Sequence, residues 1–454
     1  MAKAATGTWK SWTRSGSDRA LAAIILASCL VVPLLFTIAL QDTFALPKVT
    51  ALRIIVVVGL VLLAVRLAVS GVRQTAFLGP LDIAVLAFVL LNIAAFAFSV
   101  DPNQSLSGEY LQYQGLLSIL LYVGFFYFAR TSLRGERRVM LLFASIAAGG
   151  TVVAAYALVQ KAGFDPIWSY TPEGRVFSTI GQPNALAAYL VLAIPVSASL
   201  LPRTQSLVRG VILLTIGMMV AALAFTLSRG GYAGFVVAGS IMAIPLICSL
   251  RLSARSFLYA LIPCLAAAVV AVSLVQPVRD TATQIWSRAV SSADLGDSSV
   301  RMHLDMWAVG AHIALDNPVL GTGQETYPEL FPRYRDAVLE PSRAGAFQPF
   351  RPESPHNVYL ATAAGAGFPA LAAYVAVLAG FFYLVVRALK ATRSGWRRIA
   401  LVALLAAAAG HLVTDAFMTA EVTSSWLFWI LMGAGLGVAG ASKRERDGPS
   451  DVSV

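Results

Sequence analysis

The sequence predicts an all-α membrane protein, a polytopic helical bundle of about twelve transmembrane helices with one long segment outside the membrane. The 454 residues are 58% hydrophobic and only 13% charged, with a mean hydropathy of +0.74. A soluble domain carries about 25% charged residues. Apolar runs that are long enough to cross a bilayer, which takes roughly 20 residues, recur from end to end. Basic residues gather at alternate ends of these runs, as in a chain that crosses a membrane repeatedly.

The apolar runs define the predicted spans and the division of the chain. The twelve spans lie near residues 20–40, 50–69, 80–99, 113–129, 138–159, 184–201, 208–227, 231–250, 256–276, 357–386, 398–418 and 424–440. The chain then divides into an N-terminal segment (1–19), spans one to nine (20–276), a cap segment (277–356), spans ten to twelve (357–440) and a tail (441–454). The tenth span contains Ala-Gly-Ala-Gly-Phe-Pro at 364–369, a candidate for a break.

The distribution of lysine and arginine assigns the two sides of the membrane. Most of the 34 basic residues fall in segments that the twelve spans put on one side, together with both termini. Because short cytoplasmic segments are rich in lysine and arginine, this side is predicted to be cytoplasmic and the cap segment external. The same bias accounts for the net charge of +11 and the pI of about 9.8. We therefore expect no nucleic-acid partner, although a basic pI by itself is typical of one.

The cap segment is rich in proline and is predicted to be irregular apart from one clear helix. This helix begins after Asp297-Ser298, which supply N-cap chemistry, and ends at Asp316-Asn317-Pro318. Its apolar positions follow helical spacing and form one stripe: Val300, Leu304, Trp307, Ala308, Ala311 and Leu315. The stripe predicts a helix that lies along the membrane surface or packs on the bundle.

Two arginines on the external side are candidates for binding phosphate. Arg229 lies in Ser228-Arg229-Gly230-Gly231, a turn so short that two helices nearly abut. A snorkelling arginine is the alternative there, but the positive-inside rule disfavours arginine on this side. Arg301 lies on the cap helix, four residues before Asp305, so a plain surface ion pair between these two is its alternative.

His356 is the candidate for a general base, since histidine is the usual base near neutral pH. It follows a proline where the cap segment re-enters the membrane, and Asn357 is expected to hold its ring. Nearby arginines and the helix N-terminus are expected to lower its pKa. The alternative is a capping or interfacial histidine. Arg175 is a third candidate for binding the diphosphate, with Asn184 in support, because Pro183-Asn184 starts a helix whose N-terminus can bind an anion; a simple helix cap is the alternative.

The remaining polar residues indicate no other chemistry. His303 and His312 are expected to be solvated on the cap helix, and the pair His411 and Asp415 is either functional or a contact between helices. The sequence has no GxxxxGK[ST], no HExxH and no DxD carboxylate pair. We therefore predict no metal and no cofactor. If a diphosphate binds, arginine is the residue that can neutralise it, through bidentate hydrogen bonds.

An ordered series of motifs resembles the O-antigen ligase and polymerase-like family over Glu173 to about Ala372. The series is Phe-Ser-Thr-Ile-Gly-Gln-Pro-Asn-Ala-Leu-Ala (177–187), Ser-Arg-Gly-Gly (228–231), Arg-Met-His-Leu-Asp-Met-Trp (301–307), Asn-Pro-Val-Leu-Gly-Thr-Gly (317–323) and Pro-His-Asn-Val-Tyr-Leu (355–360). Each motif alone is weak, whereas their order around a large external loop is fairly specific. The first six spans resemble no particular family.

The resemblance implies a bundle in the inner membrane with a periplasmic cap. It also implies a metal-independent, inverting transfer of a glycan from an undecaprenyl diphosphate carrier to a hydroxyl of a lipid or glycan acceptor, such as lipid A–core. Arg229 and Arg301 match the diphosphate-binding arginines of the family, Arg175 and Asn184 match a less clearly assigned motif, and His356 matches the proposed base. A repeat-unit polymerase, a protein O-oligosaccharyltransferase and, from a different class, a transporter or flippase stay open as alternatives.

Overall fold

The structure is a computed structural model, all of whose long elements are helices over the residues that it describes. These residues are 2–70, 79–168, 174–249, 297–347, 351–393 and 395–446, together with 283–284, 286–288, 290 and 294.

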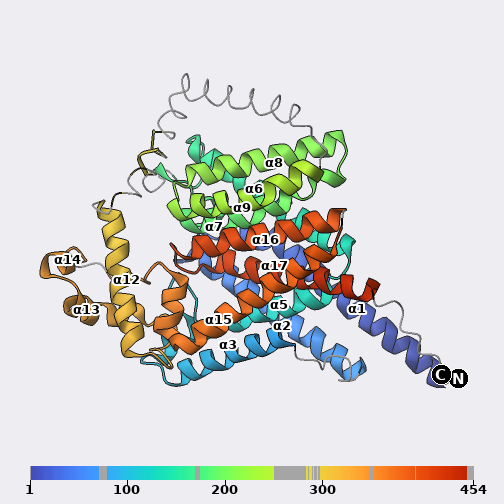
Figure 1. The fold of residues 1–454 in the computed structure, drawn as a ribbon, viewed down its shortest axis with the longest axis horizontal. Coiled ribbons are helices and arrows are strands. Elements are labelled where there is room, and N and C mark those ends of the chain that lie inside the picture. Colours follow the sequence, from blue (N-terminus) through green and yellow to red (C-terminus); the bar gives the residue numbers. More distant parts are fainter. Residues whose placement is uncertain are drawn as a thin grey trace.

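The helices follow the predicted order along the chain (Figure 1). Before the cap segment they are α1 (Ala2–Val31), α2 (Ala45–Ser70), α3 (Pro80–Ala97), α4 (Pro102–Ser107), α5 (Leu116–Ser132), α6 (Glu136–Lys161), α7 (Pro183–Ala198), α8 (Ser206–Phe225) and α9 (Arg229–Ser249). The cap segment contains α12 (Ser298–Asp316), α13 (Tyr327–Val338) and α14 (Pro341–Gly345). The bundle is completed by α15 (Val358–Ala391), α16 (Trp396–Asp415) and α17 (Val422–Arg446).

The prediction of a polytopic helical bundle is confirmed. Ten helical stretches among the described residues are long and apolar enough to cross a membrane, and they coincide with ten of the twelve predicted spans. The predicted span 113–129 corresponds to α5, which is apolar but has only 17 residues. The predicted span 256–276 lies outside the described residues.

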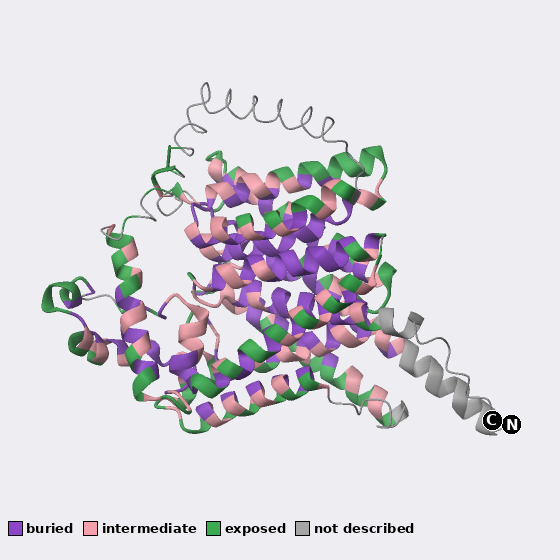
Figure 2. Cartoon of the chain, viewed as in Figure 1, coloured by how far each residue is buried: buried purple, intermediate pink, exposed green. Residues whose placement is uncertain are grey.

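The burial pattern separates a central core from a lipid-facing shell (Figure 2). Helices α7, α16 and α17 are the most buried of the candidate spans, whereas most of α2, α3 and α8 is not buried. Leucines such as Leu86 on α3 and Leu214 on α8 expose about half of their surface or more. An apolar side chain that is exposed on a spanning helix finds lipid as its solvent, so these helices form the lipid-facing surface.

Helices α9 and α16 approach each other closely at a pair of glycines. A Cβ atom on Gly234 would lie 2.5 Å from the carbonyl oxygen of Gly410, and one on Gly410 would lie 2.7 Å from that of Gly234. Small residues allow this approach, because helices in lipid associate through close packing of their backbones. The contact fixes the start of α9, which carries Arg229, relative to α16 and the turn that follows it.

Helix α15 is broken at Gly367, as the sequence predicted. Gly367 has a φ of 81° and a ψ of 168°, a conformation that is essentially limited to glycine. The loop before α13 fills the break with three backbone hydrogen bonds. The Thr322 amide donates to the Ala364 carbonyl at 3.0 Å, and the Gly323 amide donates to the Gly365 carbonyl at 2.9 Å. In the other direction, the Phe368 amide donates to the Pro318 carbonyl at 2.9 Å. A break in a spanning helix leaves backbone amides and carbonyls without hydrogen-bond partners in the helix. The motif at 317–323 supplies these partners.

The cap helix α12 has the predicted ends but a different packed face. Its N-cap Asp297 accepts hydrogen bonds from the Ser299 and Val300 amides at 3.1 and 3.2 Å. Leu304 and Leu315 of the predicted stripe are 40% and 63% exposed. The buried positions are instead Asp305, Met306, Val309, Gly310, Ile313 and Ala314. This face has an apolar stripe of its own, Met306, Val309 and Ile313, which packs in one cluster with residues of α13 and α15. Gly310 allows the close approach, because a Cβ there would lie only 3.1 Å from Leu360 and Pro355.

The cap segment is more helical than expected, because two of its prolines start helices. Pro328 and Pro341 occupy the first turns of α13 and α14, where the missing N–H has no helical partner to lose. Helices α12, α13 and α14 lie together at one end of the bundle, opposite the end where α1 begins (Figure 1). We call this end the cap end.

Candidate active site

The turn between α8 and α9 brings together two of the predicted arginines. Helix α8 ends at Phe225 and α9 begins at Arg229, so the predicted tight turn is present. Arg175 donates from Nε to the Thr226 carbonyl at 2.8 Å and from Nη2 to Asn184 Oδ1 at 2.7 Å. Arg175 and Asn184 are therefore joined as the sequence suggested, and both are held against the turn that carries Arg229. The side-chain N-cap of α7 is Gln182 rather than Asn184.

The start of α12 links the turn to the third arginine. Arg229 Nη2 lies 3.6 Å from Asp297 Oδ1, and Asp297 is the N-cap of α12. The backbone amide of Arg301, one turn further on, donates to the Asp297 carbonyl at 2.9 Å, and the Arg301 side chain is exposed. Arg229 and the first turn of α12, which leads to Arg301, thus lie at one helix N-terminus, which itself favours anions.

A fourth arginine was not singled out from the sequence. Arg288 Nη1 lies 3.5 Å from the Leu227 carbonyl oxygen, in the same turn that Arg175 contacts. No motif surrounds it in the sequence, and only the fold brings it here. The guanidinium groups of Arg175, Arg229 and Arg288 therefore lie around the starts of α7, α9 and α12, and Arg301 is exposed on the first turns of α12. This arrangement suits a ligand with several negative charges.

His356 is held by a short chain of hydroxyl groups. Its Nδ1 lies 3.1 Å from Thr419 Oγ1, which in turn lies 2.6 Å from Ser354 Oγ. The backbone amide of His356 donates to Ser354 Oγ at 3.0 Å. His356 has a φ of 51°, in the left-handed region that a non-glycine residue seldom adopts, so the surrounding contacts impose this conformation.

The expectation that Asn357 holds the ring of His356 is wrong. Asn357 is the N-cap of α15, and its Oδ1 accepts from the Leu360 amide at 3.0 Å. A short polar side chain directly before a helix satisfies a free amide of the first turn in preference to a more distant group. The ring finds its partner in Thr419, on the turn between α16 and α17.

The environment keeps the His356 ring neutral. Burial and, to a smaller extent, the neighbouring His303, whose ring centroid lies 5.6 Å away, together lower its pKa from the usual 6.5 to about 4. A lowered pKa was expected, but its causes differ from the expected arginines and helix N-terminus. His303 was also expected to be solvated, whereas it is half-buried beside His356.

A neutral histidine held at Nδ1 is suited to accept a proton at Nε2. The distances fit a chain in which Nδ1–H donates to Thr419 Oγ1 and Thr419 donates to Ser354 Oγ, and in that tautomer the lone pair of His356 is on Nε2. The hydrogen bond that one ring nitrogen makes sets which nitrogen carries the proton. Two hydroxyl groups thus occupy the place that a carboxylate takes in other histidine-based sites.

Asp305 has a structural role, because it joins two helices of the cap segment. It is buried and forms an ion pair with Arg343 of α14, with Arg343 Nε at 3.3 Å from Asp305 Oδ2. The pair joins α14 to α12 and so stabilises the cap segment that carries Arg301. His411 and Asp415 are buried in α16 with Nε2 and Oδ1 3.5 Å apart. Among the described residues, no group of three His, Cys, Asp or Glu could hold a metal ion.

Comparison with known families gives one match. The sequence profile described as O-antigen ligase matches residues 212–375, a stretch that includes Arg229, Arg301 and His356. Arg175 and Thr419 lie outside it. No curated protein matches the chain.

Proposed function

Because the profile match supports the O-antigen ligase-like family, we propose that the chain transfers a glycan from an undecaprenyl diphosphate carrier to an acceptor hydroxyl at the cap end of the bundle. The observation that carries the proposal is the gathering of arginines around the start of α12, a helix whose His303 lies beside the neutral His356. Multi-pass helices and a polar site at one end of the bundle suit a donor that is anchored in the membrane by its lipid.

In this proposal His356 is the general base. Its Nε2 takes the proton of the acceptor hydroxyl as the oxygen attacks the anomeric carbon of the donor sugar. The bond from that carbon to the diphosphate oxygen breaks, and the lipid diphosphate leaves as an anion. Attack opposite the leaving group inverts the anomeric centre. A positioned base accelerates such a step by typically 10²–10⁴-fold.

The arginines stabilise the leaving group. Negative charge grows on the departing diphosphate, and preorganised cations that are aimed at the developing charge lower the barrier. Arg229 and Arg301 are assigned to the diphosphate, with Arg175 holding the α8–α9 turn in place through the Thr226 carbonyl. Diphosphate is a good leaving group, so the reaction needs neither a strong general acid nor a metal ion.

Transfer by the purified protein in detergent, with undecaprenyl diphosphate-linked glycan and the native acceptor, tests the proposal. We expect Arg229→Lys and Arg301→Lys to lose most of the turnover, because a point charge does not replace a bidentate fork. His356→Gln should lose 10²–10⁴-fold in turnover with donor binding retained. Arg203→Lys is the matched control, because Arg203 forms an exposed ion pair with Glu136 away from the site. Near-normal turnover of His356→Gln would overturn the role of the base.

Glycan analysis of a deletion strain distinguishes the possible acceptors. Accumulation of lipid-linked polymer indicates a ligase for lipid A–core, and accumulation of single lipid-linked repeat units indicates a polymerase. Loss of glycan from proteins alone indicates a protein O-oligosaccharyltransferase.

A further inference from the structure

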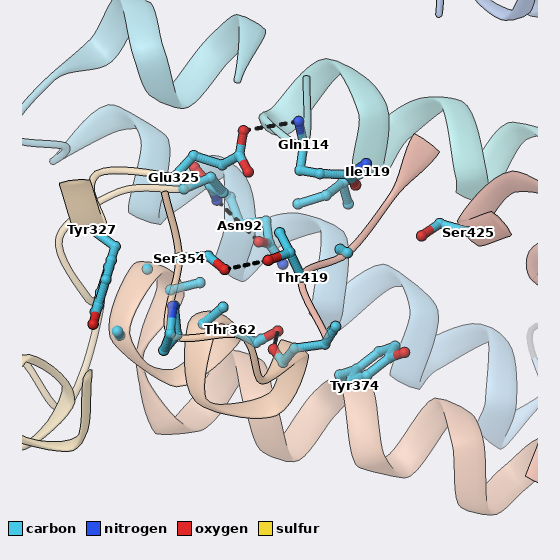
Figure 3. A pocket seen from close by; sticks show the side chains of 18 of the residues that line it. Asn92, Gln114, Ile119, Glu325, Tyr327, Ser354, Thr362, Tyr374, Thr419 and Ser425 are labelled. Carbon is cyan, nitrogen blue, oxygen red and sulfur yellow. Dashed lines mark hydrogen bonds between the residues drawn. The ribbon is translucent and has the colours of Figure 1, made fainter. Parts of the chain in front are cut away.

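A cavity of about 140 Å³ lies beside the histidine, and we propose that it binds one uncharged pyranose unit of a glycan. It is lined by residues of α3, α5, α15 and α17, the 322–327 loop and the turn before α17 (Figure 3). Since one water in the liquid takes about 30 Å³, the cavity holds about five waters. A single sugar ring with its hydroxyl groups is of this size.

The inner end of the cavity is aromatic. Phe88, Tyr374 and Trp429 come from three helices, and all are buried. The ring centroids of Phe88 and Tyr374 are 5.4 Å apart, and those of Phe88 and Trp429 are 6.3 Å apart. Aromatic rings present a negative face, and the C–H bonds on one side of a pyranose ring are its natural partners. The floor therefore favours a ligand with one apolar face.

The walls of the cavity carry amides and hydroxyls. Gln324 and Asn92 are buried and bound to each other, with Gln324 Nε2 donating to Asn92 Oδ1 at 3.0 Å. Gln114 and Thr362 also line the cavity (Figure 3). Gln324 is only 6% exposed, and its Oε1 has no hydrogen-bond partner among the described residues. This oxygen has almost no accessible surface, and a buried acceptor is costly to leave unmatched, so a small turn of the amide toward the cavity would let it accept from a ligand hydroxyl.

Above about pH 7 the charge of the cavity excludes acidic sugars, because burial raises the pKa of Glu325 to about 7 and its carboxylate is mostly ionised only above that value. Glu325, Glu353 and Asp415 line it, whereas none of its described lining residues is lysine or arginine. Glu325 accepts from the Glu109 and Gln114 amides at 2.6 and 3.0 Å, so its carboxylate is fixed in the wall. Like charges that face each other in a binding site reject a ligand. The phosphates that the arginines attract are therefore kept out of this space.

The cavity shares a wall with the candidate base. Ser354 and Thr419 line it and are also the two hydroxyls that hold His356 (Figure 3). A sugar in the cavity thus lies next to the reaction centre and apart from the arginines. The placement of a substrate sugar next to the reaction centre rests on the proposed function, whereas the binding of a free saccharide in the cavity does not depend on that function.

Saturation-transfer NMR on the full-length protein in detergent micelles tests the site. The probes are the methyl β-pyranosides of glucose, galactose and mannose, each paired with its uronate, which differs only by a carboxylate at C6. At pH 8 we expect saturation transfer to at least one neutral probe and more than tenfold weaker transfer to its uronate. No transfer to any neutral probe, or equal transfer to both members of each pair, would overturn the proposal.

Variants locate the binding. Thr362→Phe fills the cavity and should abolish the signal, and Gln324→Leu, which adds no bulk, should weaken it at least threefold. Ser240→Phe is the matched control, because Ser240 is exposed on α9 and bonds to its own helix as Thr362 does, at 2.7 Å in both cases. An unchanged signal in both Thr362→Phe and Gln324→Leu would contradict the assignment.

Two further measurements separate this site from the transfer reaction and identify the source of the sugar. Arg229→Ala should lose transfer but keep the saccharide signal, so a failure of the proposed function leaves the site testable. In steady-state transfer, Gln324→Leu should raise the KM of the substrate whose sugar occupies the cavity, either the acceptor or the donor glycan. A KM unchanged for both would mean that the cavity takes no part in glycan binding.

Discussion

Thr419 Oγ1 lies 3.1 Å from His356 Nδ1, although 63 residues separate them along the chain. This contact orients the imidazole, and its partner Ser354 precedes the histidine by only two residues. The positioning of the candidate base therefore depends on the turn between α16 and α17, outside the stretch that matches the family profile.

Removal of the Thr419 hydroxyl should impair turnover without changing donor binding. Thr419→Val keeps the shape but leaves Nδ1 without its partner, so the ring loses its preferred tautomer. Partners of this kind are worth about 10–100-fold in other sites, and we expect a fall of that size in kcat. The KM of the donor should stay the same, and Thr419→Ser should restore most of the rate. Equal rates for the valine and serine variants would show that the hydroxyl does not orient the ring.

The pH dependence of transfer should reflect the lowered pKa of His356. Only the neutral imidazole accepts a proton, and burial with the nearby His303 lowers the pKa to about 4. Activity should therefore be flat above about pH 5 and fall as the pH approaches 4, rather than near the ordinary value of about 6.5. The profile of kcat/KM measures this directly.

Two matched variants test whether His356 is the group whose titration determines the pH profile. His303→Ala removes a neighbour that lowers the pKa, so the midpoint should move upward. His312→Ala is the control, since both histidines place Nδ1 2.8 Å from a carbonyl of the preceding turn of α12, and His312 is exposed. An acid limb that does not move in His303→Ala would argue against His356 as the titrating group.

Asp297 should compete with the donor for Arg229. The carboxylate lies 3.6 Å from Arg229 Nη2 and would repel an incoming diphosphate. Asp297→Asn keeps an N-cap acceptor for the Ser299 and Val300 amides, since asparagine caps helices as well as aspartate. We expect a lower donor KM at an unchanged folding stability. Asp316→Asn, at the other end of α12, is the control and should leave KM as it is.

The orientation in the membrane can be tested with two serines. Ser342 on α14 and Ser206 at the start of α8 are both exposed, and the predicted topology puts them on opposite sides. In a background without Cys29, Cys248 and Cys264, a cysteine in place of Ser342 should react with an impermeant thiol reagent in intact cells. One in place of Ser206 should not. The reverse pattern would place the site on the cytoplasmic side.

Gly367 should not tolerate a side chain. An alanine there would adopt a conformation that costs about 1–3 kcal/mol, and its Cβ would lie 2.3 Å from the Val319 carbonyl oxygen. We expect Gly367→Ala to lower the free energy of unfolding by at least about 2 kcal/mol, measured as a fall in Tm in detergent. Gly239→Ala is the control, since nothing lies within 4 Å of its added Cβ, and it should be neutral or slightly stabilising.

Local patterns in the sequence predicted much of this fold. The ends of α12 follow from Asp297 and Asn317, and the break in α15 follows from the glycines and proline at 364–369, because these effects act within a few residues. The packed face of α12 was not predictable in the same way. The helix has a second apolar stripe through Met306, Val309 and Ile313, and which stripe packs depends on contacts with α13 and α15 that are distant in sequence.

The candidate site was predictable only where a motif carries it. Arg229 and His356 lie in recognisable motifs, whereas Arg288 and Thr419 lie in none and reach the site through contacts between distant segments. Asn357 was assigned to the His356 ring because it is adjacent in sequence, yet its side chain caps the first turn of α15. The pKa of His356 likewise depends on burial, which the order of residues alone does not reveal.

The pairing of the 318–323 loop with the break in α15 has a consequence for biogenesis. The loop is synthesised before the helix, so its amides and carbonyls are already available when residues 364–368 leave the ribosome. Without this partner, the open carbonyls of the break would enter lipid at a cost of several kcal/mol each. Insertion of the second half of α15 should therefore wait for the cap segment to cross the membrane. Ribosome-stalled chains that are long enough for Ala391 to have left the exit tunnel would then show the loop protected from protease as soon as that helix is in the bilayer.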